Sequence, residues 1–253
     1  MHSRELIRSL ISRRPAPRFG FWLGNPHPDT WPILHRYFGT ASEEDLRRKL
    51  GDAETVADVD EFDWPDLDRL HFEETISRLG EAGDVYRASG FWCPFFHDIM
   101  DLMGMENYMV KMLTHPEVVQ AITARVCTFY LEANERFFAA AGDLVDGFFF
   151  GNDFGTQIDL LLSPARFDEF VLPWFRRFTD QGHRYGYQVV LHSCGSIYRV
   201  IGRLIEAGVD CLHPLQARAQ NMEAEKLARE FGGKVAFMGG IDTQRVLNQG
   251  TPA

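Results

Sequence analysis

Val189-Val-Leu-His-Ser-Cys-Gly-Ser196 is an apolar run that ends in a His-x-Cys pair and a glycine. The apolar run predicts a buried β-strand, in which side chains two positions apart lie on the same face. His192 and Cys194 are then neighbours, and zinc favours Cys sulfur and His nitrogen as ligands. A bare His-x-Cys pair is also compatible with a hydrogen-bonded core histidine and a packed thiol. The segment therefore predicts either two metal ligands or two core residues at the end of a strand.

Strand-like and helix-like stretches alternate downstream of this segment. Helical patterns over 196–207 and 222–231 separate apolar runs over 209–213 and 234–238. Alternation at this spacing is typical of a parallel sheet whose strands are joined by right-handed helical crossovers. The sequence therefore predicts an α/β fold.

Further strands are expected upstream, over 19–24, 84–90 and 144–150. The second and third of them are separated by a long helix. Thr114-His-Pro-Glu117 is expected to start that helix, with threonine as the cap and proline in the first turn. Ser163-Pro164 predicts the start of another helix in the same way. These elements extend the alternation toward the N-terminus.

Polar side chains recur directly after the predicted strand ends. In a parallel barrel these positions meet at one mouth, where the sites of (β/α)8 enzymes are built. We therefore predict a fold of the (β/α)8 TIM-barrel type, forming a single domain over residues 1–253. The polar residues in these positions are Asp153, His192, Cys194, His213, Gln216 and Asp242.

The number of expected strands falls short of a complete barrel. About six are found, whereas closure needs eight. We therefore expect the barrel to be truncated before its last two βα units. An open barrel exposes the unpaired edges of its terminal strands, so either marginal solubility or contacts between copies in a homo-oligomer are expected. The six strands begin near Phe19, Val85, Val145, Val189, Val209 and Val235.

Composition narrows the class of protein and its compartment. The chain carries 26 Lys and Arg against 36 Asp and Glu, a net charge of -10, which argues against nucleic acid as a partner. No stretch approaches the roughly 20 apolar residues of a membrane span. The Arg-rich start lacks the apolar core of a signal peptide. Four cysteines in 253 residues are too few for a disulfide framework, so a reducing cytoplasm is expected.

Four stretches together carry a resemblance to a known family. They are His192-Ser-Cys-Gly195, Leu204-Ile-Glu-Ala-Gly-Val-Asp210, His213-Pro-Leu-Gln216 and Gly239-Gly-Ile-Asp-Thr-Gln244. In these stretches the chain resembles the uroporphyrinogen decarboxylase superfamily, continuously from about Asp143 to the end. That superfamily includes the tetrapyrrole decarboxylase of porphyrin biosynthesis and zinc-dependent, corrinoid-linked methyltransferases.

The methyltransferase branch provides the first functional hypothesis. The resemblance implies that His192 and Cys194 bind zinc, with a cysteine nearer the C-terminus as third ligand. Zinc would hold a substrate thiol as thiolate, which attacks a methyl group on a corrinoid, and a corrinoid protein is the implied partner. Cys211, His213 and Asp242 are substitutes for the third ligand by strand position, although Cys211 begins its strand and is expected at the wrong end.

Two alternatives stay open. The first is decarboxylation of uroporphyrinogen. Resemblance to that branch of the superfamily implies an N-terminal segment of the form Arg-Gln-Ala-Gly-Arg, which binds the carboxylates of the substrate. This chain reads Phe21-Trp-Leu-Gly-Asn-Pro-His-Pro28 at the corresponding place, without an arginine. The other alternative is a barrel that binds a corrinoid or tetrapyrrole without catalysis.

Asp153 is the leading candidate for a catalytic group that is not a metal ligand. At the mouth of a barrel its carboxylate would orient a substrate amine or hydroxyl, or act as a general base. The alternative is an Asx-type turn, in which Asp153 hydrogen-bonds the adjacent glycine loop. The residues expected to contact a small-molecule substrate are Asn152, Gln157, His213, Gln216 and Asp242. Phe91-Trp-Cys-Pro-Phe-Phe96 is an aromatic segment that belongs either to a pocket or to the core.

Overall fold

The computed structural model describes residues 64–242 and 244–250, together with isolated positions between 32 and 59. The strand predicted over 19–24 and the segment Phe21–Pro28 lie outside the described residues. The chain divides into two compact units. One comprises Met1–Asp63 with Ile99–Ile122, and the other comprises Trp64–Asp98 with Thr123–Ala253. Every candidate site residue belongs to the second unit.

The second unit contains a five-stranded parallel sheet in the order β1-β2-β3-β4-β5. Neighbours in the sheet are also neighbours in sequence, as repeated βα crossovers require. The sheet confirms the predicted α/β class and agrees with a TIM-barrel type of fold. The strands are β1 (Ala88–Ser89), β2 (Gly147–Gly151), β3 (Gln188–His192), β4 (Cys211–His213) and β5 (Ala236–Phe237).

The register of the sheet places three strand ends in one row. Gly151 of β2 pairs with His192 of β3, and His192 pairs in turn with His213 of β4. Paired residues of neighbouring strands point to the same face. The two histidines therefore lie side by side at the carboxyl end of the sheet.

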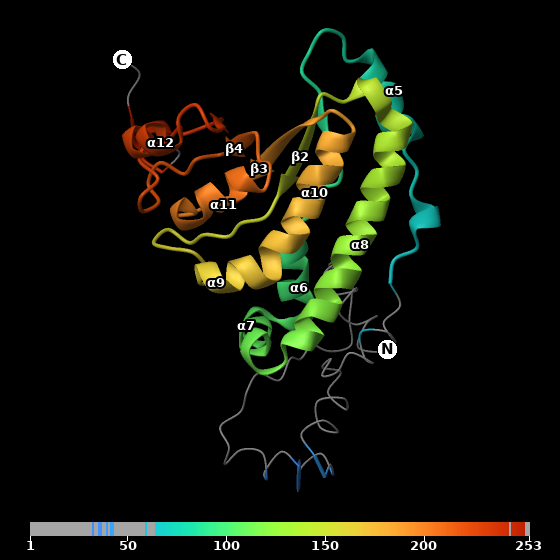
Figure 1. The fold of residues 1–253 in the computed structure, drawn as a ribbon, viewed down its shortest axis with the longest axis vertical. Helices are drawn as coiled ribbons and strands as arrows, with labels where there is room; N and C mark the ends of the chain where they lie inside the picture. The colour runs from blue at the N-terminus through green and yellow to red at the C-terminus, as the bar shows by residue number, and fades with distance from the viewer. Residues whose placement is uncertain are drawn as a thin grey trace. The chain divides into compact units, whose positions relative to one another are not determined.

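The opposite face of the sheet is packed against helices. Phe148 and Phe150 of β2 are fully buried, and their rings contact Phe138 of α8 (Pro116–Ala141) and Phe175 of α10 (Leu172–Arg184) at centroid distances of 5.2 Å each. Figure 1 shows α10 running alongside β2 and β3. Truncating a phenylalanine in such a core typically costs about 3–5 kcal/mol of stability, so this layer fixes the strand from which the site emerges.

A helical run over residues 164–184 departs from regular α-helix in its middle. It begins as α9 (Pro164–Arg166), where the Ser163 side chain caps the Arg166 amide as predicted. Over Phe167–Val171 (η4) the hydrogen bonding is π-helical, and the Leu172 amide donates to the Phe167 carbonyl. Such a bulge frees one carbonyl and changes the direction of the helix just before α10.

The long helix starts later than its capping pattern predicts. Thr114 ends α7 (Met105–Thr114), and its hydroxyl donates to the Val110 carbonyl instead of capping α8. The remaining described helices, including short 3-10 turns, are η2 (Leu67–Arg69), α5 (Glu73–Glu81), α6 (Phe95–Met103), η3 (Gly142–Leu144), η5 (Tyr198–Val200), α11 (Ile201–Glu206), α12 (Ala224–Phe231) and α13 (Val246–Gln249).

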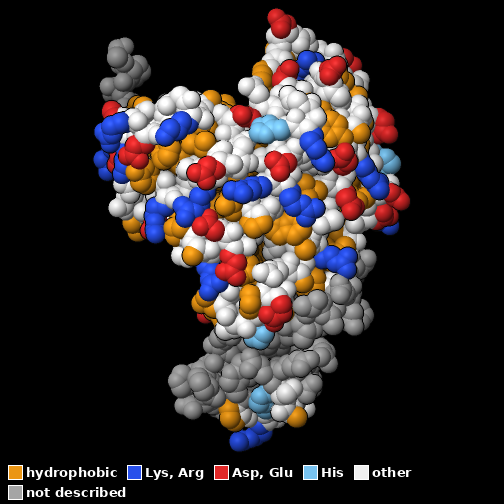
Figure 2. Space-filling model, in the orientation of Figure 1, with side chains coloured by type: hydrophobic (Ala, Val, Ile, Leu, Met, Phe, Trp, Pro, Cys, Tyr) orange, Lys and Arg blue, Asp and Glu red, His pale blue; other side chains and the backbone are white. Residues whose placement is uncertain are grey.

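The surface carries both signs of charge. On the face seen in Figure 2, blue and red side chains are interspersed over the described residues. None of the helices in the described part of the chain is both long enough and apolar enough to cross a membrane.

Candidate metal centre

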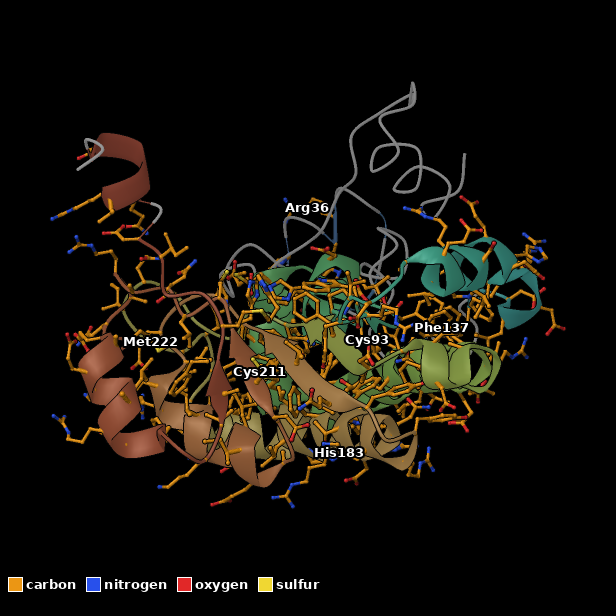
Figure 3. All side chains as sticks on the ribbon, turned by 90° about the horizontal axis from the view of Figure 1, so that it is seen from above. Arg36, Cys93, Phe137, His183, Cys211 and Met222 are labelled. Carbon is orange, nitrogen blue, oxygen red and sulfur yellow. The ribbon has the colours of Figure 1, made fainter. Side chains whose placement is uncertain are left out.

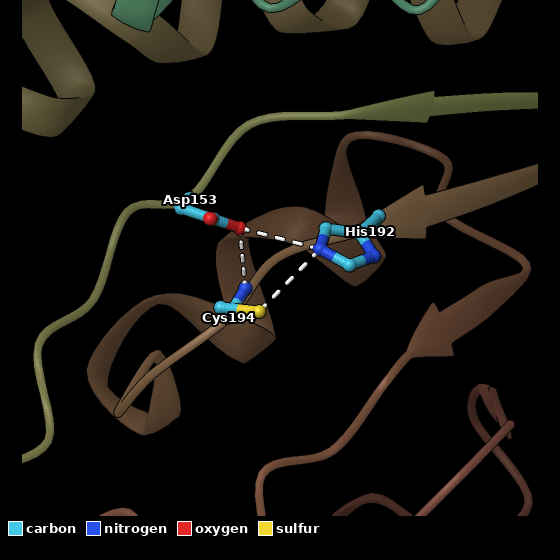
Figure 4. A group of neighbouring side chains, drawn as sticks. All are labelled: Asp153, His192 and Cys194. Carbon is cyan, nitrogen blue, oxygen red and sulfur yellow. Dashed lines mark hydrogen bonds and ion pairs between the residues drawn. The ribbon is translucent and has the colours of Figure 1, made fainter.

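Three side chains that can bind a metal meet beyond the carboxyl ends of β2 and β3. His192 is the last residue of β3, Cys194 lies two residues further on, and Asp153 lies two residues after β2. Their Nε2, Sγ and carboxylate oxygen atoms all lie within 4.8 Å of one another. Figure 4 shows the three side chains converging from the end of β3, from the loop that follows it and from the loop after β2.

The distances within this group are short. His192 Nε2 lies 3.4 Å from Cys194 Sγ and 3.5 Å from Asp153 Oδ1. The same Asp153 oxygen accepts a hydrogen bond of 2.7 Å from the backbone amide of Cys194. Asp153 therefore holds the loop that carries the thiol and also faces the imidazole.

Two glycines allow the loops after β2 and β3 to approach so closely. A Cβ atom on Gly155 would lie 2.7 Å from the Ser196 amide nitrogen, and one on Gly195 would lie 2.3 Å from the Gly155 carbonyl oxygen. Gly195 also has a φ of 84°, which favours glycine. Backbone packs on backbone here, and the Ser196 amide donates to the Thr156 carbonyl over 2.7 Å. This contact brings Asp153 to Cys194.

His213 lies on the other side of the His192 ring. The two Nδ1 atoms are 2.9 Å apart, and the ring centroids are 5.0 Å apart. Burial, followed by the nearby His192, lowers the pKa of His213 below its ordinary value. His213 is therefore held as a neutral imidazole at neutral pH.

An aromatic side chain covers the histidine. Trp92 lies 5.2 Å from both the His192 ring and the Phe149 ring, centroid to centroid. Its indole lies over Gly151, where an added Cβ would come within 2.2 Å of Trp92 Cζ2. Phe149 in turn contacts His213 edge-on at 5.5 Å. The aromatic segment predicted over 91–96 thus contributes at least one ring to the site.

Cys194 is a protonated thiol at neutral pH in this environment. Burial is the largest cause that raises the pKa of this thiol, and the negative charge and hydrogen bond of Asp153 raise it further. A hydrogen bond from the Gln216 side chain opposes them. A metal ion or another cation close to the sulfur would lower the pKa of this thiol and favour the thiolate that binds metals.

Gln216 belongs to a network of side-chain amides around the same loops. Its Oε1 accepts from the Gly195 amide (3.0 Å) and from Gln157 Nε2 (2.9 Å). Gln157 Oε1 accepts from Gln244 Nε2 over 3.3 Å. The network joins the loops that follow β2, β3, β4 and β5, so it fixes their mutual positions at the mouth.

Other predicted site residues have a different place. Asn152 is buried and braces the backbone, because its Oδ1 accepts from the Phe96 amide and its Nδ2 donates to the Cys93 carbonyl. Asp242 pairs with Arg218 at 2.6 Å and accepts from the Gln244 and Arg245 amides.

Cys211 begins β4, as predicted, and is not part of the three-residue group. It pairs in the sheet with Val190, two residues before His192. Figure 3 labels Cys211 on the sheet. Among the described residues, Asp153 is therefore the side chain that completes the group.

Two contributors to the site were not anticipated. Phe149 sits in an apolar strand, and only the pleat of β2 shows that it shares a face with Gly151. In the sequence Gly155 is only one residue of a polar loop after a strand, and nothing near it shows which backbone lies opposite. The sequence does not reveal the roles of Phe149 and Gly155, because each role depends on contacts with segments that are distant in the chain.

The donor set fits zinc. Bond lengths of 2.0–2.3 Å to nitrogen, oxygen and sulfur correspond to ligand separations of about 3.3–3.8 Å in a tetrahedron. The separations of 3.4 Å and 3.5 Å from His192 Nε2 fall in this range. Histidine, cysteine and aspartate are all ligands of zinc in proteins.

Fold and site together define a parallel α/β protein, consistent with the TIM-barrel type, whose candidate centre lies at the carboxyl ends of the strands. The chain belongs to the uroporphyrinogen decarboxylase (URO-D) family, whose model matches residues 46–253. The predicted resemblance is thereby confirmed.

A solved structure of a methyltransferase from Methanosarcina mazei is similar to this chain, with a TM-score of 0.52 and 17% sequence identity. The likeness covers 80% of this chain and 52% of that one, so this chain spans about half the length of that methyltransferase. At this identity the likeness shows the fold alone. No curated protein matches the sequence.

Proposed function

We propose that this protein is a zinc-dependent methyltransferase that moves a methyl group between a corrinoid and a thiol. The observation that carries the proposal is the convergence of His192 Nε2, Cys194 Sγ and an Asp153 carboxylate oxygen within 4.8 Å of one another, with Nε2 3.4 Å from the sulfur and 3.5 Å from Oδ1. Zinc at this position would hold a substrate thiol as thiolate, the nucleophile for a methyl group on corrinoid cobalt. A methyltransferase neighbour is in keeping with this chemistry, and the proposed compartment is a reducing cytoplasm, in which thiols stay free.

The chain's own residues have distinct parts in this proposal. His192 and Cys194 provide nitrogen and sulfur ligands, and Asp153 provides the oxygen in place of the third cysteine that the family resemblance implies. Trp92 packs against the His192 ring, with 5.2 Å between the ring centroids, and helps to orient it. The amide network at Gln216 and Gln157 is the proposed contact surface for a small-molecule substrate.

Zinc content tests the proposal directly. We expect about one zinc per chain by elemental analysis after purification without chelator, and loss of that zinc in Cys194→Ser. Cys211→Ser is the matched control, because Cys211 is partly exposed and lies outside the group. Asp153→Ala is expected to lose zinc and thiol methylation while keeping its circular dichroism spectrum. Wild-type protein that binds no zinc contradicts the proposal.

Decarboxylation of a porphyrinogen is the second candidate, because the matching family model is named for it. A substrate rich in carboxylates needs cationic partners, whereas Asp153 brings a negative charge to the centre of this site. The cation Arg218 already forms an ion pair with Asp242. Loss of carboxyl groups from uroporphyrinogen by metal-free protein favours this candidate, whereas tetrapyrrole binding without turnover favours a non-catalytic barrel.

A further inference from the structure

His192 makes a hydrogen bond on the side of its ring that faces away from the proposed metal. Its Nδ1 lies 2.9 Å from Nδ1 of His213. A hydrogen bond between two such nitrogens requires that one carries the hydrogen and the other presents a lone pair. The hydrogens of the two rings are therefore coupled.

The opposite nitrogen of His192 decides which ring donates. Nε2 lies 3.4 Å from Cys194 Sγ and 3.5 Å from Asp153 Oδ1. A metal binds Nε2 through the lone pair of this nitrogen, so Nε2 cannot carry a hydrogen at the same time. The hydrogen of a neutral imidazole must then lie on Nδ1. His213 is the group placed to accept that hydrogen.

We propose that His213 is a positioning residue, which accepts the Nδ1 hydrogen of His192 and so keeps Nε2 free to bind the metal. The inference rests on the proposed zinc site and deepens it. His213 was expected to be a substrate contact or a third ligand. Its Nδ1 instead meets the far side of the His192 ring, and it does not belong to the three-residue group.

The packing around both rings supports a fixed orientation. His213 ends β4 and pairs in register with His192 at the end of β3, so their backbones cannot slide past each other. Phe149 contacts the His213 ring edge-on, and Trp92 lies against the His192 ring. A histidine ligand usually donates to a carboxylate, a carbonyl or water. An imidazole acceptor orients the ring without adding negative charge to the site.

Zinc affinity measured by competition with a chromophoric chelator tests this role. His213→Phe keeps a ring but removes the acceptor, and the zinc affinity is expected to fall about 10- to 100-fold. His213→Asn offers an amide oxygen as acceptor and is expected to recover part of the loss. His183→Asn is the matched control, because His183 hydrogen-bonds Asp210 over 2.9 Å near the start of β3, away from the site.

The hydrogen positions provide a second readout that loss of folding does not mimic. In zinc-loaded wild type labelled with ¹⁵N-histidine, NMR is expected to show hydrogen on Nδ1 of His192 and none on Nδ1 of His213. Wild-type affinity in a folded His213→Phe variant, or hydrogen on Nδ1 of His213 in the zinc form, overturns the positioning role and leaves the proposed function standing. Wild type that binds no zinc overturns both.

Discussion

Asp153 has two effects at the scale of single residues. Its carboxylate accepts the Cys194 amide hydrogen, and its charge raises the pKa of the Cys194 thiol after the larger effect of burial. Asp153→Asn keeps an oxygen that can accept the amide hydrogen but removes the charge. The variant therefore separates the structural effect of Asp153 from the electrostatic one.

We expect Asp153→Asn to lower the pKa of the Cys194 thiol in metal-free protein. At a pH of about 8, below the raised pKa, more thiolate is then present, and alkylation by iodoacetamide is expected to rise about 2- to 10-fold. The difference should vanish above the thiol pKa, where both proteins are ionised. Mass spectrometry assigns the label to each cysteine, and Cys211, whose pKa is raised by its own burial and by Asp210, is the internal control. An unchanged rate at Cys194 contradicts the electrostatic effect.

At the scale of elements, the contact between the loops after β2 and β3 depends on two glycines, Gly155 and Gly195. The loops after β2 and β3 touch through backbone atoms of Gly155, Gly195 and Ser196, with no room for a Cβ atom between them. An added methyl group must push these loops apart, which also separates Asp153 from Cys194.

Gly155→Ala is expected to destabilise the fold by about 1–3 kcal/mol, because the new Cβ meets backbone that cannot turn aside. Urea denaturation measures this change, and zinc affinity is expected to fall with it. Gly202→Ala is the control, since Gly202 lies in α11 with open space around it and tolerates alanine with a gain of up to about 1 kcal/mol. Equal stability of Gly155→Ala and wild type would show that the loops are not held by this contact.

Zinc binding has a consequence for the whole molecule. A ligand that binds the folded chain raises its free energy of unfolding by about 2.7 kcal/mol at a hundredfold excess over Kd. We expect the melting temperature to rise when zinc is added and to fall back to its starting value when EDTA removes the zinc. Cys194→Ser should show neither change, whereas Cys211→Ser should show both. If the melting temperature of wild type does not change when zinc is added, the folded chain has no zinc site of this kind.

The parallel α/β class of the fold was predictable from the sequence. Burial on both faces makes β2 and β3 nearly continuous apolar runs, and β-strand periodicity places His192 and Cys194 on one side. The family resemblance also followed from local stretches, and the matching family model confirmed it. These features depend on residues that are close in sequence, so periodicity and turn chemistry suffice to find them.

Partnerships across the sheet were decided by the tertiary structure. The sequence placed Asp153 and His213 after strands. It predicted neither the hydrogen bond between Asp153 and the Cys194 amide nor the one between the Nδ1 atoms of His192 and His213. Both depend on the register of neighbouring strands and on loops that pack through glycine. The sequence by itself determined the type of fold and the candidate donors. Only the tertiary structure decided which donors meet, because distances between separate loops are set by packing and leave no periodic pattern in the chain.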